Sequence, residues 1–259
     1  MKTVFITGAS SGIGAALARA YAEQGATLGL LARRQEVLEE LRQSLPDPGK
    51  HHIYAVDVTD HAALSKAATD FMQAVGQVNV VIANAGISVG TLSEYADDIQ
   101  VFDSVLQTNL MATVATFSPF INPMKTYAQS ADCRLVGIGS VAGIRGLPGA
   151  GAYCASKAAV ISYCESLRVE LRGSGIQVVT IAPGYIDTPM TRGNPYPMPF
   201  LMPVQAFCQA ALKAIASGSS YRVIPWQMGV VAKLLRSLPN WLYDAAFARA
   251  ARKPRASDQ

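Results

Sequence analysis

The sequence predicts an α/β fold: a doubly wound parallel sheet, flanked by helices on both faces and followed by a C-terminal helical extension. Two observations support this prediction. Strand-like runs alternate with helix-like runs along most of the chain, an order that calls for a parallel sheet with right-handed crossovers. The strand-like runs are also almost wholly apolar, as in residues 78–83, which suits strands that helices cover on both faces.

The elements follow in chain order from this alternation. An apolar, β-branched run at residues 2–7 leads into a glycine-rich turn, and the alanine-rich residues 15–21 then favour a helix. Similar pairs of runs repeat as far as residue 224. The expected strands are residues 2–7, 26–32, 52–57, 78–83, 133–139, 176–182 and 220–224, and the expected helices are residues 12–24, 34–45, 61–75, 97–118, 151–172 and 203–217.

The chain has 259 residues, half of them hydrophobic, which suffices for one sizeable domain. We expect residues 1–224 to form this domain, with residues 188–203 as a substrate lid, and residues 225–259 to form the extension. No stretch approaches the ~20 apolar residues of a membrane-spanning helix, and the first residues do not read as a targeting peptide. A cytoplasmic protein is therefore expected.

The cysteines and histidines show no metal-ligand spacing, so no metal site is expected. We interpret the cysteines as reduced, packed thiols, and prefer packing over a redox switch at Cys154. These residues are Cys133, Cys154, Cys164, Cys208, His51, His52 and His61. No nucleic-acid partner is expected.

The glycine-rich turn at residues 8–14 is the first candidate binding site. Its spacing is Gly-x-x-x-Gly-x-Gly and differs from the Gly-x-Gly-x-x-Gly of the usual dinucleotide fingerprint. Glycines permit a tight turn and close backbone approach, and the helix that follows offers free N–H groups to a pyrophosphate. Because a strand precedes this turn and a helix follows it, nucleotide binding is favoured over an ordinary turn.

Tyr153 and Lys157 form the candidate catalytic pair, with Ser140 thirteen residues before Tyr153. In a helix, a spacing of four residues places the phenol and the ammonium on the same face. A free tyrosine has a pKa of about 10, and a nearby positive charge can lower it by about 1–3 units, towards the range useful in acid–base catalysis. Alone, such a pair is commonly a surface pair; the nucleotide-binding turn favours catalysis.

In order and spacing, these motifs resemble the short-chain dehydrogenase/reductase family. The likeness covers about residues 2–190 and also includes Asn84-Ala85-Gly86, Asn109 and Pro183-Gly184. It implies a Rossmann-type domain that transfers hydride between a nicotinamide cofactor and a carbonyl or alcohol carbon. Homodimers or homotetramers are usual in such a family.

The resemblance also implies a role for each catalytic residue. Tyr153 would supply the proton, and Ser140 would orient the substrate oxygen. Lys157 would lower the pKa of the tyrosine and bind the nicotinamide ribose, while Asn109 would hold a water that links Lys157 to solvent.

The expected cofactor contacts lie beyond the carboxyl ends of the strands. Asp57 would accept a hydrogen bond from the adenine amine, and Thr188 would help to anchor the nicotinamide carboxamide. The full set is Gly8, Ser10, Ser11, Gly12, Ile13, Gly14, Arg33, Arg34, Asp57, Val58, Asn84, Ala85, Gly86, Tyr153, Lys157, Pro183, Gly184, Ile186 and Thr188.

The end of the second strand favours NADP over NAD. An acidic residue about 20 positions after the glycine turn would bind the ribose 2′-hydroxyl of NAD. Here Ala32 replaces that carboxylate, and Arg33 and Arg34 offer bidentate pairing to a 2′-phosphate. Arg33 is the stronger candidate, whereas Ser10 and Ser11 stand where phosphate-preferring relatives often add a basic residue.

Residues 188–203 are rich in proline and methionine, a composition that predicts an irregular, adaptable lid. An apolar lid favours a hydrophobic lipid-, acyl- or steroid-like carbonyl or alcohol as substrate. Equally, the same residues could cover the core of the domain itself.

Residues 225–259 hold six basic and two acidic side chains, a net charge of +4 that equals the net charge of the whole chain. Positions 230, 231, 234, 235 and 238 form an apolar helical stripe. Such an extension could lie on an anionic membrane surface, or pack on the core or on a second subunit.

Two other functions compete with that of an oxidoreductase. One is a non-catalytic NADP(H)-binding sensor, against which the intact Ser140, Tyr153, Lys157 and Asn109 argue. The other is a membrane-associated scaffold that acts through its C-terminal helices.

Overall fold

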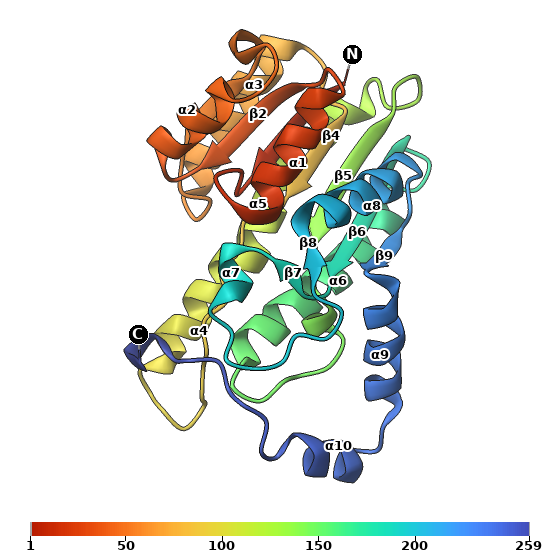
Figure 1. Ribbon diagram of the computed structural model, residues 1–259. Helices are drawn as coiled ribbons and strands as arrows, with labels where there is room; N and C mark the ends of the chain where they lie inside the picture. Colours follow the sequence, from red (N-terminus) through yellow and green to blue (C-terminus); the bar gives the residue numbers. More distant parts are fainter. Residues whose placement is uncertain (1, 259) are drawn as a thin grey trace.

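The computed structural model describes residues 2–258, and a seven-stranded parallel sheet forms its centre (Figure 1). The strand order is β3-β2-β1-β4-β5-β6-β9, so the doubly wound sheet predicted from the sequence is confirmed. These strands are β1 (Thr3–Thr7), β2 (Thr27–Ala32), β3 (His52–Ala55), β4 (Val80–Ala83), β5 (Cys133–Ile138), β6 (Ile176–Pro183) and β9 (Tyr221–Ile224).

Helices cover both faces of the sheet, and each face has its own hydrophobic core. Successive residues of a strand point to opposite faces, so Val4 and Ile6 of β1 join one core while Phe5 joins the other. The first core contains α1 (Gly12–Glu23), α2 (Gln35–Gln43) and α8 (Val204–Ala216), and the second contains α3 (His61–Val75), α5 (Ala112–Lys125) and α6 (Gly151–Glu170).

The helix expected at residues 97–118 is in fact three consecutive segments. These are α4 (Asp98–Leu106), a π-helical turn η2 (Gln107–Met111) and α5, which continues to Lys125. The helix passes Pro119 and Pro123 because Phe117, Phe120 and Met124 bury their side chains completely beneath the sheet. Their burial outweighs the loss of two backbone donors.

The lid segment is more regular than its prolines suggested. Pro189 starts the one-turn helix α7 (Pro189–Arg192), where a proline costs little because the first N–H groups of a helix need no partner. The segment ends at β8 (Met202–Pro203), which pairs with β7 (Ile186–Asp187). Short 3-10 turns lie at η1 (Pro48–Lys50), η3 (Val141–Gly143) and η4 (Ala256–Asp258).

The extension consists of α9 (Trp226–Ser237) and α10 (Asn240–Phe247), after which the chain runs back towards α4 (Figure 1). The fully buried residues of α9 are Met228, Gly229 and Ala232, none of which belongs to the predicted stripe. Val230 and Leu234 of that stripe are 47% and 64% exposed. Positions 231, 235 and 238 are half-buried, so the protein covers only part of the stripe.

Arg145, on the loop after η3, holds this extension in place. Its guanidinium lies 3.8 Å from the ring centroid of Tyr243 and donates to the carbonyl of Leu238 at 2.9 Å. The Tyr243 hydroxyl in turn donates to the carbonyl of Gly146. Among residues 2–258, no helix is long and apolar enough to cross a membrane.

Candidate active site

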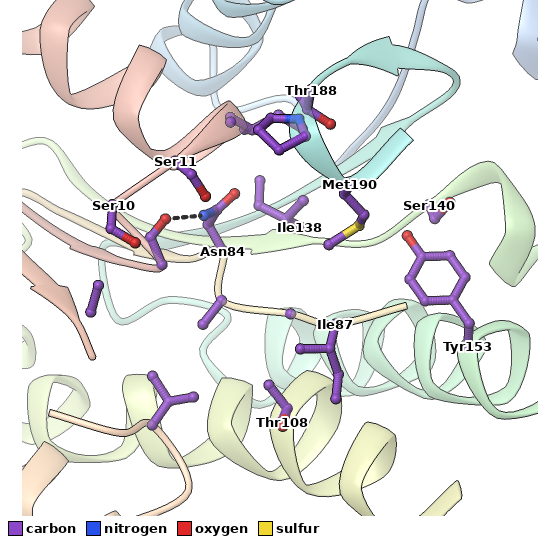
Figure 2. Close-up of a pocket in the computed structure, with 18 of the residues that line it drawn as sticks. Ser10, Ser11, Asn84, Ile87, Thr108, Ile138, Ser140, Tyr153, Thr188 and Met190 are labelled. Carbon is purple, nitrogen blue, oxygen red and sulfur yellow. Dashed lines mark hydrogen bonds between the residues drawn. The ribbon is translucent and has the colours of Figure 1, made fainter. Parts of the chain in front are cut away.

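A cleft of about 660 Å³ opens at the carboxyl ends of the central strands (Figure 2). It lies above β1 and β4, where the order of the chain reverses within the sheet, as expected for a ligand crevice in an open α/β fold. All but two of the predicted site residues line it. The exceptions are Gly14 and Asn109, which stand just behind its wall.

The glycine turn is compact enough to exclude side chains at two positions. Gly8 has a φ of +66°, a left-handed conformation that other residues rarely adopt. A Cβ on Gly14 would lie 2.6 Å from the Asn84 amide nitrogen and would overlap the Gly8 carbonyl oxygen. Gly14 therefore allows α1 to pack against the turn, and does not itself face the cleft.

Thr7 and Asn84 join this turn to β4. The Asn84 amide donates to the carbonyls of Thr7 and Gly8 at 3.0 and 3.2 Å, and the Thr7 hydroxyl accepts from the backbone N–H of Asn84 at 3.1 Å. Figure 2 shows Asn84 directed at the turn, beside Ser11. These bonds fix the cleft floor and give Asn84 a structural role.

The start of α1 is suited to a phosphate group. The Ser11 side chain makes no capping hydrogen bond to the first turn of the helix. The N–H groups there, with the positive end of the helix dipole, remain directed at the cleft, as pyrophosphate binding requires. The residues present thus fit a dinucleotide.

Arg33, Arg34 and Asp57 stand together at one end of the cleft. The Arg33 side chain is 74% exposed and lies 3.9 Å from the Asp57 carboxylate, whereas Arg34 donates to the Ser10 hydroxyl at 3.3 Å. Hydrogen bonds from the Thr59 backbone and hydroxyl, together with Arg33, lower the pKa of Asp57. An ionised Asp57 can accept a hydrogen bond from a ligand amine, and Arg33 retains donors for an anion.

At the other end, helix α6 and the turn after β5 bring Ser140, Tyr153 and Lys157 to the wall of the cleft, and Figure 2 shows Ser140 beside the Tyr153 hydroxyl. The Ser140 hydroxyl accepts from the backbone N–H of Ala142 at 3.1 Å. Lys157 is buried, and its Nζ donates to the carbonyl of Ile138 at 2.8 Å.

The pKa values in this group differ from the simple expectation for a tyrosine–lysine pair. Burial raises the pKa of Tyr153 above its ordinary value, and the neighbouring Ser140 hydroxyl acts in the opposite direction. Burial also lowers the pKa of Lys157 to about 8. The Lys157 Nζ is 5.9 Å from the centroid of the Tyr153 ring and bonded elsewhere, so Ser140 is the residue that favours the phenolate in this state.

Asn109 lies in the π-helical turn and is completely buried. Its amide oxygen accepts from the backbone N–H of Ile87 at 2.8 Å, and its amide nitrogen donates to the Ile87 carbonyl and the Ser156 hydroxyl. A Cβ on Gly86 would lie 3.1 Å from the Asn109 oxygen and 3.6 Å from the Lys157 Nζ. Asn109 and Lys157 therefore flank the same backbone stretch.

A smaller cavity of about 90 Å³ adjoins Tyr153 and Ser140 on the side away from the glycine turn. Apolar residues form part of its wall, and the polar residues Ser88, Tyr196 and Lys253 form another part. Its apolar residues include Val141, Ala142, Leu147, Ala150 and Met190.

Sequence reasoning assigned no role to Thr7, Ser88, Ser156 or Lys253. Thr7 ends the apolar run at residues 2–7, directly before the glycine-rich turn, so its position at a strand end was a usable signal. Lys253 gave none, because it lies more than 90 residues from Tyr153 and only the return of the chain brings the two to one cavity.

Comparison with known proteins agrees with this geometry. The sequence profile of the short chain dehydrogenases matches residues 2–196. An uncharacterized oxidoreductase of Myxococcus xanthus (strain DK1622) is 35% identical over 249 residues, which cover 96% of this chain and 97% of that protein. A 3-oxoacyl-(acyl-carrier-protein) reductase of Chlamydia muridarum (strain MoPn / Nigg) is 34% identical over 194 residues, covering 74% and 77%.

Among solved structures, a 3-ketoacyl-(acyl-carrier-protein) reductase from Brucella melitensis, complexed with NADH, has the same fold. It superposes with a TM-score of 0.79 at 23% identity, over 86% of this chain and 96% of that one. The chain belongs to the short-chain dehydrogenase/reductase family, and it is an oxidoreductase of the kind that uses a nicotinamide cofactor.

Proposed function

We propose that the protein is an NADP(H)-dependent oxidoreductase that interconverts a carbonyl and an alcohol on a largely hydrophobic substrate. The observation that supports this most directly is the position of the neighbouring Tyr153 and Ser140 hydroxyls. Both line the long nucleotide-sized cleft and the small cavity, so a substrate in the cavity would meet a cofactor in the cleft at these two groups.

Each residue has a chemical task in this proposal. The bound nicotinamide supplies or accepts the hydride. As negative charge develops on the carbonyl oxygen, Tyr153 donates its proton to that oxygen and Ser140 donates a hydrogen bond. Lys157, whose Nζ is 5.9 Å from the Tyr153 ring centroid, lines the cleft and would hydrogen-bond the cofactor ribose. In the oxidative direction, Tyr153 takes the proton back.

The choice of NADP rests on Ala32, Arg33 and Arg34. Ala32 ends β2 without a carboxylate, and Arg33 lines the cleft with its side chain 74% exposed. A 2′-phosphate would gain charge-assisted hydrogen bonds there, whereas a 2′-hydroxyl would find no acidic partner at residue 32.

The substrate class rests on the cavity and the relatives. The wall of Val141, Leu147 and Met190 suits a hydrophobic carbon skeleton. The relative from Chlamydia muridarum acts on 3-oxoacyl groups according to its name, which supports an acyl-like substrate here. Assays of the proposed function should therefore begin with panels of β-ketoacyl and aryl ketone substrates.

Replacing Tyr153 by phenylalanine tests the proposal. The Tyr153→Phe variant loses the proton donor but keeps the ring, so NADPH oxidation should fall by about 100-fold or more, in line with loss of general acid catalysis. NADPH affinity, measured by fluorescence titration, should change little. Turnover close to that of the wild type would refute the assignment of Tyr153.

The alternatives have less support. A sensor that only binds cofactor would not require Tyr153 and Ser140 hydroxyls at the boundary of a second cavity. Contact with a membrane or a second subunit remains a prediction. The exposed side chains of Trp226, Val230 and Leu234 offer an apolar surface for either one, beside the exposed Lys233.

A further inference from the structure

The end of the chain forms a strap across the small cavity. This C-terminal strap (residues 252–255) runs beside Gly90, whose N–H donates to the carbonyl of Pro254 at 3.1 Å. A Cβ on Gly90 would overlap the Lys253 carbonyl oxygen, and one on Gly149 would lie 2.8 Å from Arg252 Cβ. The two loops that contact the strap thus have a glycine, Gly90 or Gly149, at the point where a side chain would collide with it.

A buried ion pair anchors the strap to α4. The Arg255 guanidinium donates twice through Nε and Nη2 to the Asp98 carboxylate at 2.9–3.0 Å, and the two side chains are only 14% and 6% exposed. The guanidinium also lies 3.6 Å from the centroid of the Tyr95 ring. Such a bidentate pair gives the strap a defined position.

The anchored strap places Lys253 in the wall of the small cavity, together with Tyr153 and Ser140. The ammonium donates to the Ser88 hydroxyl at 2.9 Å. Among the side chains of residues 2–257, no carboxylate forms an ion pair with it. Burial accordingly lowers the pKa of Lys253.

A half-buried cation without an anionic partner is costly for a fold, and it strongly favours an anionic ligand. We infer that Lys253 is a specificity-determining residue, which pairs with a carboxylate that the substrate bears close to its reacting carbonyl. This inference rests on the proposed function and narrows its substrate class to oxo acids with an apolar remainder.

In this inference the apolar wall and the Lys253 ammonium contact different parts of the substrate. The carbonyl meets Tyr153 and Ser140, the carboxylate meets Lys253, and the hydrophobic portion contacts side chains such as Leu147 and Met190. Because Lys253 and Ser140 belong to the wall of one small cavity, the two oxygen-bearing groups of the substrate lie near each other, as in a 2-oxo acid.

Phenylglyoxylate and its methyl ester provide a matched pair of probes, since both have the same aryl ketone and only the first is charged. With NADPH as the reductant, we expect the Lys253→Met variant to lose about 10- to 100-fold in kcat/KM on the acid, the effect of losing one charge-assisted hydrogen bond. On the ester, the variant should stay within about threefold of the wild type, as expected for an interaction that only the carboxylate makes.

Two further variants separate charge from folding. Lys253→Arg keeps the cation and should retain part of the preference for the acid. Lys233→Met removes an exposed lysine from the same extension and should change neither rate. Equal losses on acid and ester in Lys253→Met, or no loss at all, would overturn the inference while leaving the oxidoreductase function intact.

If the wild type reduces neither probe, a binding measurement still tests the carboxylate site at Lys253. Such a result would count against the proposed function for this class of ketone, and calorimetric titration with phenylglyoxylate would then test Lys253 by itself. Binding to the wild type that Lys253→Met weakens about 10-fold or more supports the carboxylate site. Equal binding, or none to either protein, rejects it.

Discussion

Replacement of Lys157 by methionine should stabilise the cofactor-free protein, although it removes a candidate catalytic group. Lys157 is 5% exposed, and burial lowers its pKa from 10.5 to about 8. At about 1.36 kcal/mol per pKa unit, this lowering of the pKa means that burial disfavours the ammonium form of Lys157 in the folded protein by about 3 kcal/mol. Loss of the hydrogen bond to Ile138 offsets about 1–2 kcal/mol, so a net gain of about 1–2 kcal/mol is expected at pH 7.

The pH dependence of this gain follows from the direction of the pKa change. Because the folded pKa is the lower one, the unfolded chain holds the extra proton between about pH 8 and pH 10.5. The destabilisation of the wild type is complete below pH 8 and disappears as the pH rises towards 10.5. The advantage of Lys157→Met should therefore shrink across this range.

Urea unfolding at pH 7 and pH 10 measures both effects. Lys213→Met is the matched control, because Lys213 is an exposed lysine on α8 and should shift the free energy of unfolding by no more than about 0.5 kcal/mol at either pH. The reasoning fails if Lys157→Met is less stable than the wild type at pH 7, or if its difference from the wild type is the same at both pH values.

Two predictions concern the cofactor. Arg33→Asp should shift the ratio of kcat/KM from NADPH towards NADH by about 10-fold or more, because it replaces the cation proposed to bind the 2′-phosphate with an acceptor for a ribose hydroxyl; an unchanged ratio would remove Arg33 from the proposed cofactor site. Gly14→Ala should lower stability by about 1–3 kcal/mol and weaken NADPH binding, because its Cβ would lie 2.6 Å from the Asn84 amide. Gly146→Ala, whose Cβ would meet nothing within 4 Å, is its control in thermal unfolding and fluorescence titration, and equal behaviour of the two variants would contradict the crowding argument.

The nucleotide end of the cleft shows how much local sequence can predict. Gly8, Asn84 and Ser140 each follow an apolar strand, and in a parallel sheet all strand ends of one kind meet at the same edge. Their convergence could be expected without coordinates. The position of Gly14 needed coordinates, since its spacing in the motif does not reveal that it packs under the turn.

The electrostatics of the catalytic group could not be predicted from spacing. Four residues of helix do place Tyr153 and Lys157 on one face, but the pKa of each depends on how much water the surrounding elements remove. Burial raises the pKa of Tyr153 and lowers the pKa of Lys157, and the Lys157 ammonium donates a hydrogen bond to the Ile138 carbonyl. Solvent exclusion is a property of the whole packed domain.

The sequence by itself determined the sheet, the order of its elements, the family and the position of the cleft, because periodicity and strand-end motifs are local and repeat along the chain. The tertiary structure alone decided which face of α9 packs, and it alone brought Lys253 to Tyr153. The physical reason is that these contacts join segments far apart in sequence. They depend on the Arg255–Asp98 ion pair and on the hydrogen bond from Arg145 to the Leu238 carbonyl. They also depend on Gly90 and Gly149, which leave room for the backbone of the strap.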